Sequence, residues 1–211
     1  MAKMPYGLLG PIIGKIGGIV ICNGKNGPYV RALPKKRKDK PTPAQKLQRL
    51  KMAAVTQFLT PMRDLLDITF LQKGGNKTAW GKACSYNIQN ALYSSGSKQK
   101  IRYSAALISQ GSMPPAFSAS ADVTAPETIT FKWTDNSWLG KANTRDRVIT
   151  VIYCETLKKC VFRTDGAYRN TETIALQVPQ FRGKVVQTWL AFISDNGRDV
   201  SPSIYTGELT L

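Results

Sequence analysis

The sequence predicts an α+β protein, in which an N-terminal β-hairpin and two to three helices precede a C-terminal antiparallel β-sandwich. Three observations predict this order. A β-branched run is followed by dense turn chemistry, apolar residues then recur at helical spacing, and from about Ile101 they alternate with a period of two. We expect a basic N-terminal region over residues 1–100 and the sandwich over residues 101–211.

Residues 1–34 favour the β-hairpin. Residues 16–22 form a β-branched run, which is typical of a strand. Residues 23–27 read Asn-Gly-Lys-Asn-Gly, and Asn-Gly pairs favour tight hairpin turns. Residues 28–33 would return as the second strand, with Tyr29 and Arg31 on one face and Val30 and Ala32 on the other.

The helical region opens with the clearest local signal in the chain. Thr42 can cap a helix, Pro43 suits its first position, and Gln45 completes a capping box. One apolar face follows at helical spacing: Leu47, Leu50, Ala54, Val55, Phe58 and Leu59. Pro61 should end or kink this helix. Shorter helices are expected over residues 62–71 and 78–93.

Period-two alternation with intervening turn residues predicts the strands of the sandwich. The candidate strands are residues 101–108, 116–123, 128–133, 147–154, 160–163, 171–178, 185–194 and 203–211. Turn sequences such as Asp135-Asn136-Ser137 and Asp195-Asn196-Gly197 separate them. Many short strands at this spacing are typical of a sandwich or a barrel.

Positive charge is concentrated near the N-terminus. The chain has a formal net charge of +17, and residues 1–60 hold 12 basic side chains but one acidic one. Such a field attracts nucleic acid, an anionic membrane or an acidic protein surface, although a solvated basic arm would have the same composition. The candidate partner-binding residues are Arg31, Lys35, Lys36, Arg37, Lys38, Lys46 and Arg49.

The absence of histidine excludes several classes of enzyme. Without an imidazole, the chain lacks the commonest general base and the commonest metal ligand, so Ser–His–Asp and Cys–His catalysis are impossible. Its four cysteines contain no Cys-x-x-Cys pair, which argues against a zinc or thioredoxin-like site. Cys154 and Cys160 could face each other across a hairpin, or all four thiols could be free in a reducing compartment. We expect no catalytic residue, no metal and no cofactor.

The remaining polar and aromatic residues give no enzymatic pattern. Acidic residues at turns and strand ends favour turn hydrogen bonds and cross-strand pairs over a catalytic acid and base. These acidic residues are Asp135, Asp146, Glu155, Asp165 and Glu172. Trp138, Tyr168 and Tyr205 could form a ligand surface, or could simply pack within the fold. No small-molecule substrate is evident.

Residues 128–211 resemble a fibronectin-type-III or related immunoglobulin-like domain. Residues 129–134, with Trp133, resemble the second strand of that fold, and residues 148–154 resemble its third. Residues 186–194 and the following Asp-Asn-Gly turn resemble the penultimate strand and its exit. Trp189 stands near the position of that family's corner tyrosine, so the resemblance does not establish the corner hydrogen bond. The resemblance implies a fold and no activity.

Nearly the whole chain also resembles an uncharacterised family from Bacteroidota with a domain of unknown function. The matching segments are Gly7–Gly10, Gly14–Gly17, Tyr29–Arg31, Pro41–Arg49, Ser85–Asn87, Lys132–Asn136 and Leu190–Ser194. This resemblance implies an ordered full-length unit and brings no function with it.

These observations together favour a non-enzymatic binding or assembly module. We expect a protein partner or self-association, through an acidic partner surface or a neighbouring copy. The alternative is a non-specific nucleic-acid-binding protein that uses the basic linker and helix at residues 31–51. The longest uncharged apolar run near the N-terminus, residues 16–22, is too short to span a membrane, and no secretory signal is evident. We therefore expect a cytoplasmic protein, unless it is exported by a route that needs no conventional signal.

Overall fold

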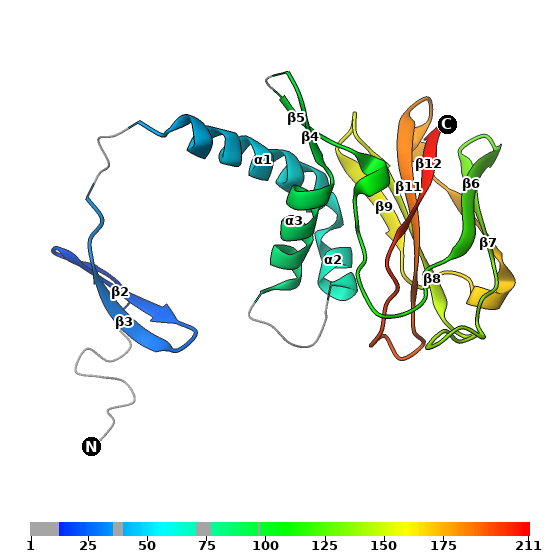
Figure 1. Ribbon diagram of the computed structural model, residues 1–211, viewed down its shortest axis with the longest axis horizontal. Coiled ribbons are helices and arrows are strands. Elements are labelled where there is room, and N and C mark those ends of the chain that lie inside the picture. The colour runs from blue at the N-terminus through cyan, green and yellow to red at the C-terminus, as the bar shows by residue number, and fades with distance from the viewer. Residues whose placement is uncertain (1–12, 36–39, 71–76, 97) are drawn as a thin grey trace, which may run out of the picture. The chain divides into compact units, whose positions relative to one another are not determined.

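The computed structural model describes residues 13–35, 40–70, 77–96 and 98–211. The chain divides into two compact units, residues 1–42 and residues 43–211. Figure 1 shows the elements of both, and each unit is described by itself below.

The N-terminal unit contains a three-stranded antiparallel sheet in the order β1-β2-β3. Its strands are β1 (Gly14–Ile16), β2 (Ile19–Gly24) and β3 (Gly27–Ala32). The predicted hairpin is confirmed as the β2–β3 pair, with Gly24 opposite Gly27. The run at 16–22 is divided, because the chain turns at Gly17, whose φ of 55° suits glycine, and Ile16 belongs to the additional strand.

Three helices begin the second unit, as expected. They are α1 (Pro43–Leu59), α2 (Arg63–Thr69) and α3 (Ala79–Asn90), with a 3₁₀ turn η1 (Thr60–Met62) between the first two. Pro61 lies in that turn, where its missing N–H ends the regular α-helical ladder. Among the described residues, none of the helices is long and apolar enough to cross a membrane.

The segment between α3 and the sandwich differs from the prediction. The chain forms a hairpin of β4 (Leu92–Ser95) and β5 (Lys98–Ile101), so α3 ends before the predicted residue 93. The strand expected over 101–108 is wrong beyond Ile101, because Tyr103–Ala105 forms the 3₁₀ turn η2. Leu107 and Ile108 then donate their backbone N–H groups to the side chains of Asn87 and Ser203 instead of to a strand.

The predicted sandwich is confirmed as two antiparallel sheets, in the orders β10-β7-β6 and β12-β11-β8-β9. The three-stranded sheet contains β6 (Phe117–Ala125), β7 (Thr128–Thr134) and β10 (Thr173–Gln177). The four-stranded sheet contains β8 (Arg147–Cys154), β9 (Lys159–Arg163), β11 (Val185–Ile193) and β12 (Ile204–Thr210). Two 3₁₀ turns flank β10: η3 (Arg169–Thr171) and η4 (Pro179–Phe181).

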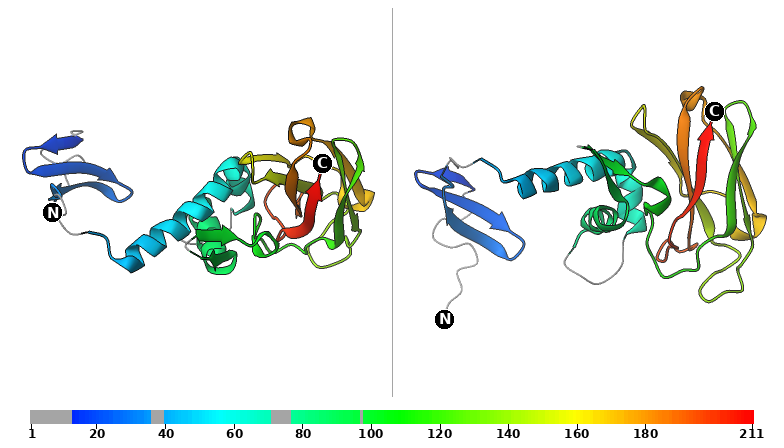
Figure 2. Two further views of the ribbon diagram at one scale, coloured as in Figure 1. Left: turned by 90° about the horizontal axis from the view of Figure 1, so that it is seen from above. Right: turned by 45° about the horizontal axis from the view of Figure 1, so that its top comes forward.

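The four-stranded sheet is buried on both faces at β8 and β11. One face packs against the other sheet and forms the sandwich core, which includes Val148, Ile152, Leu190 and Phe192. The opposite face, with Val151 and Trp189 among its members, packs under the helices and forms the helix–sheet core. Residues 43–211 therefore build three layers, with the helices outside the four-stranded sheet, as the two views of Figure 2 show.

The two faces of the four-stranded sheet separate the cysteines on β8 and β9, so these two do not form a disulfide bond. Cys160 lies opposite Tyr153, whereas Cys154 lies opposite Lys159. Cys154 belongs to the sandwich core and Cys160 packs against the helix–sheet core, so their side chains point to opposite faces. All four cysteines are free thiols.

Candidate functional site

The N-terminal sheet has one apolar face. Ile16 pairs with Ile19, Ile19 with Ala32, and Ile21 with Val30, so these five side chains share a face across all three strands. We call this set, Ile16, Ile19, Ile21, Val30 and Ala32, the arm face. Its large side chains remain accessible, with 48% of Ile16, 39% of Ile19 and 54% of Val30 exposed, while Ile21 is buried.

Basic residues occupy the opposite face of this sheet. Val20 pairs with both Lys15 and Arg31, which places these two cations away from the arm face, and both are exposed. Lys35, after the last strand, is also exposed. The candidates Lys36, Arg37 and Lys38 lie outside the described residues.

The first half of α1 is exposed all round. The predicted contacts Lys46 and Arg49 lie here on the surface, as expected of solvated cations. Leu47 and Leu50, which begin the predicted apolar face, are 44% and 50% exposed. Burial begins only at Val55, so α1 packs through its C-terminal half and presents an amphipathic, basic N-terminal half.

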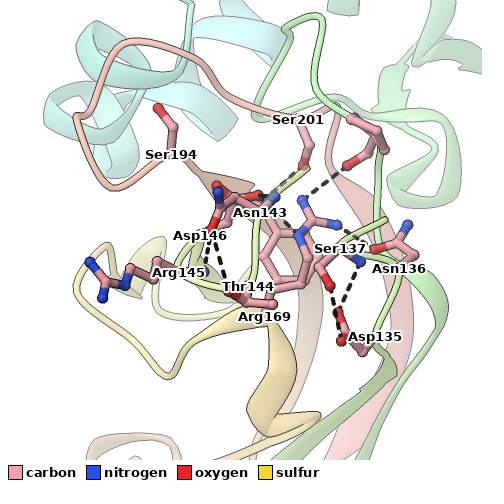
Figure 3. Close-up of polar contacts among 12 residues, drawn as sticks. Asp135, Asn136, Ser137, Asn143, Thr144, Arg145, Asp146, Arg169, Ser194 and Ser201 are labelled. Carbon is pink, nitrogen blue, oxygen red and sulfur yellow. Dashed lines mark hydrogen bonds and ion pairs between the residues drawn. The ribbon is translucent and has the colours of Figure 1, made fainter. Parts of the chain in front are cut away.

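A buried arginine organises one end of the sandwich. Arg169, in η3, is fully buried, and its guanidinium lies 3.8 Å from the centre of the Phe192 ring. Its Nε donates to Asp146 Oδ2 at 3.1 Å, its Nη1 donates to Asn136 Oδ1, and its Nη2 donates to the Pro114 carbonyl at 3.3 Å. Figure 3 shows these contacts converging from separate segments of chain.

The backbone around Arg169 completes the same network. Its N–H donates to the Asp146 carbonyl at 2.7 Å, and its carbonyl accepts from Trp133 Nε1 at 2.6 Å. Burial lowers the pKa of the Arg169 guanidinium, while the charge of Asp146 opposes that shift. An arginine side chain stays charged even when it is buried. The buried ion pair between Arg169 and Asp146 therefore joins the β7–β8 loop to η3.

A polar cleft lies beside this network, between the β7–β8 loop and the β11–β12 loop. It has a volume of about 420 Å³. The first loop contributes Lys141, Asn143, Arg145 and Asp146. The second loop contributes Ser194, Asp195, Asn196 and Asp199. We call this the loop cleft.

Both walls of the loop cleft are held by internal hydrogen bonds. Asp146 Oδ2 accepts from the Asn143 N–H at 2.7 Å, in addition to the bond from Arg169. On the other wall, the Asp199 N–H donates to Ser194 Oγ at 3.0 Å, and the Ser194 N–H donates to the Asp199 carbonyl at 2.9 Å. The cleft is thus shaped by the fold before any ligand arrives.

A second, smaller pocket of about 190 Å³ lies over the aromatic part of the helix–sheet core, and Phe58, Tyr103 and Tyr153 line it. Burial, followed by the charge of Glu155, raises the pKa of Tyr103 well above its ordinary value. The same two causes raise the pKa of Tyr153 to about 12. Both phenols therefore stay protonated at neutral pH, which suits packing and not proton abstraction.

The sequence predicted neither the network nor the cleft, although it predicted turn roles for two of the acidic residues involved. Asp135 makes the predicted turn bonds, since its carboxylate accepts from the N–H and the hydroxyl of Ser137. Asp146 also makes the expected turn bond, since its carboxylate accepts from the Asn143 N–H, but it is in addition 2% exposed and paired with Arg169, 23 residues away. No local pattern signals that pair. Of the three aromatic candidates, Trp138 is 76% exposed and Tyr168 46%, whereas Tyr205 packs on Trp189.

The described residues contain no group of three or more Cys, Asp or Glu side chains placed to hold a metal ion. Comparison with known proteins identifies a family whose function is unknown. Residues 11–207 match the family of unknown function DUF6266. No curated protein matches the sequence.

Proposed function

Because the chain belongs to DUF6266, a family of unknown function, we propose from its own surfaces that it is a non-enzymatic binding or assembly module. The observation that carries this proposal is the arm face, an apolar sheet surface on which Ile16, Ile19 and Val30 remain accessible. A contiguous exposed apolar surface of this kind marks an interaction site.

The small core of the N-terminal sheet supports the proposal of an interaction site. Between residues 13 and 35, Val20 and Ile21 are the buried apolar side chains, so the described part of this unit has almost no core of its own. An isolated hairpin is marginally stable in water, and packing of the apolar face of a small sheet against another surface adds stability. Burying a large aliphatic side chain contributes about 1.5–3 kcal/mol, so covering Ile16, Ile19 and Val30 would stabilise the sheet substantially.

A neighbouring copy is the partner that best suits the arm face. Lys15 and Arg31 project from the opposite face, so two arm faces can pack together without burying these charges. The cations on that opposite face, and Lys46 and Arg49 on α1, then remain available to an acidic partner surface.

Sedimentation velocity over a concentration series tests the assembly. We expect the full chain to self-associate, and a variant with Ile19→Ser and Val30→Ser to remain monomeric. Tyr29→Ser is the matched control, because Tyr29 is 51% exposed and lies on the opposite face of the same strand. A full chain that stays monomeric at every concentration would refute assembly through the arm face and favour a different protein partner.

Binding of nucleic acid is the second candidate, favoured by the net charge of +17 and the exposed Arg31, Lys35, Lys46 and Arg49. Fluorescence anisotropy with labelled DNA and RNA tests it, beside a variant with these four residues changed to Ser. Each phosphate neutralised should add about 0.7–0.9 to the slope of log affinity against log salt. Polyglutamate as competitor separates contacts with phosphates from attraction to any polyanion. Absence of binding at low salt would exclude this candidate.

We also propose that the sandwich is a fibronectin-type-III-like scaffold. Its sheet orders, β10-β7-β6 and β12-β11-β8-β9, agree with that arrangement, and Trp133 is buried as the resemblance implies. Trp189 does not supply the corner hydrogen bond, because its Nε1 has no partner among the described residues.

The free thiols support a reducing, cytoplasmic compartment.

A further inference from the structure

We propose that the loop cleft binds a neutral saccharide, a function independent of the arm face. The cleft combines a volume of about 420 Å³ with a lining that consists entirely of polar and charged residues. Pockets for small molecules have volumes of roughly 300–1,000 Å³, and most are lined by apolar side chains. A fully polar lining of this size therefore favours a ligand that makes hydrogen bonds on most of its surface.

The groups that face the cleft include both donors and acceptors that the protein leaves free. Among the described residues, the Asp199 carboxylate and the side chains of Lys141 and Arg145 make no hydrogen bond or ion pair. The Asn143 and Asn196 side-chain carbonyls accept from the N–H groups of Arg145 and Arg198, which leaves their amide groups as donors. A sugar hydroxyl can both donate and accept, so it can satisfy either kind of group.

The charges of the cleft argue against a strongly charged ligand. Asp146 is paired with buried Arg169, and Asp195 lies 3.7 Å from Arg147. The remaining charges are two cations, Lys141 and Arg145, and one anion, Asp199. Because the free cations and the free anion lie in one cleft, neither a polyanion nor a polycation finds a surface of uniform opposite charge.

The β7–β8 loop also carries an exposed tryptophan outside the lining of the cleft, and we assign it the stacking of a second sugar unit. Trp138 is 76% exposed and lies three residues before Lys141, and the adjacent Leu139 is 52% exposed. An aromatic ring has an apolar face on which the C–H face of a pyranose can stack. Exposed tryptophans supply large, rigid contact area, and this one lies on a loop that the Arg169–Asp146 pair anchors.

The rigidity of the two loops explains why such a site could bind without a deep cavity. Asp146 is 2% exposed, and Arg169 and Asn143 hold its carboxylate. The Ser194–Asp199 bonds fix the opposite wall. Since the walls are ordered in advance, a ligand loses little affinity to the ordering of the protein.

Titration of the ¹⁵N-labelled full chain with maltotriose, cellotriose and triacetylchitotriose tests this proposal. We expect at least one of these sugars to shift amide signals within residues 141–146 and 194–199 in a saturable manner. Asp199→Ala removes a free acceptor and should weaken binding about tenfold, and Trp138→Ala should weaken it to a similar degree.

Asp122→Ala is the matched control, because Asp122 is an exposed carboxylate on β6, in the other sheet, and its loss should leave binding unchanged. Trp138 is exposed and Asp199 is half-buried, and the amide spectrum of each variant shows directly whether it is folded. The proposal is overturned if none of the three sugars shifts the signals of the two loops, or if folded Asp199→Ala and Trp138→Ala variants bind as tightly as the unmodified chain.

Discussion

Arg169 is fully buried and charged, and its guanidinium meets a carboxylate, a side-chain amide, a backbone carbonyl and the face of an aromatic ring. These partners come from three parts of the chain: Asn136 and Asp146 lie on the β7–β8 loop, Pro114 precedes β6, and Phe192 lies on β11. A buried charge is costly unless its hydrogen bonds are satisfied, so these partners must be present together. One residue thereby fixes the position of the β7–β8 loop that forms a wall of the loop cleft.

Replacement of this arginine should be among the most damaging single changes in the sandwich. Arg169→Met keeps much of the volume but leaves Asp146 buried without its partner, so we expect the free energy of unfolding to fall by about 3–5 kcal/mol. Urea denaturation followed by tryptophan fluorescence measures this. Arg182→Met is the control, since Arg182 pairs with Glu127 on the surface with 82% of its side chain exposed. Equal denaturation midpoints for the two variants would contradict the assigned role.

The elements of the second unit owe their positions to two-sided packing. Alternate residues of β8 and β11 enter the sandwich core and the helix–sheet core. These strands therefore read as almost continuous apolar runs, unlike an ordinary sandwich strand with one polar face. The helices cover the helix–sheet core, and one of them, α3, is also stabilised by a cap at its N-terminus.

Thr78 caps α3, because its Oγ1 accepts a hydrogen bond from the Gly81 N–H at 3.1 Å. Thr78→Ala leaves that N–H without this partner and should lower the free energy of unfolding by about 1 kcal/mol. Thr78→Ser retains the hydroxyl and should have an effect within a few tenths of a kcal/mol. Parallel thermal and urea denaturation compares the two, and an alanine variant as stable as the serine variant would show that the cap contributes nothing.

The two units differ in the amount of apolar surface that each of them buries. Residues 43–211 contain both apolar cores, whereas residues 1–42 carry nine basic side chains, one acidic side chain and an exposed arm face. The larger unit has the means to fold alone, while the described part of the smaller one would gain stability from a surface that covers its arm face. This difference is what the proposed assembly role requires of an N-terminal arm.

Deletion of residues 1–42 should leave a folded fragment. We expect residues 43–211 to unfold cooperatively, with a midpoint within about 3 °C of the full chain, because neither core loses a member. Differential scanning calorimetry measures the midpoint, and near-ultraviolet circular dichroism reports the aromatic packing around Trp189. Loss of that signal in the fragment would show that the first 42 residues are needed to fold the second unit.

Local signals in the sequence determined most of the elements. Pro43 marks the start of α1 and Pro61 its end, and apolar runs separated by turn residues mark the strands from β6 to β12, because proline and turn chemistry act within a few residues. The same local reasoning misplaced residues 102–108, where apolar alternation suggested a strand. There the backbone bonds to Asn87 and Ser203, partners distant in sequence.

The amino-acid composition excluded catalysis that depends on histidine, because the chain has none. The sequence also determined that positive charge is concentrated near the N-terminus. Only the tertiary structure decided that Leu47 and Leu50 stay exposed while Phe58 and Leu59 are buried on the same helix. It also decided that Asp146 meets Arg169, and that two loops distant in sequence, at residues 141–146 and 194–199, enclose a cleft. Burial and long-range pairing depend on which surfaces meet when the chain folds, and no short stretch of sequence carries that information.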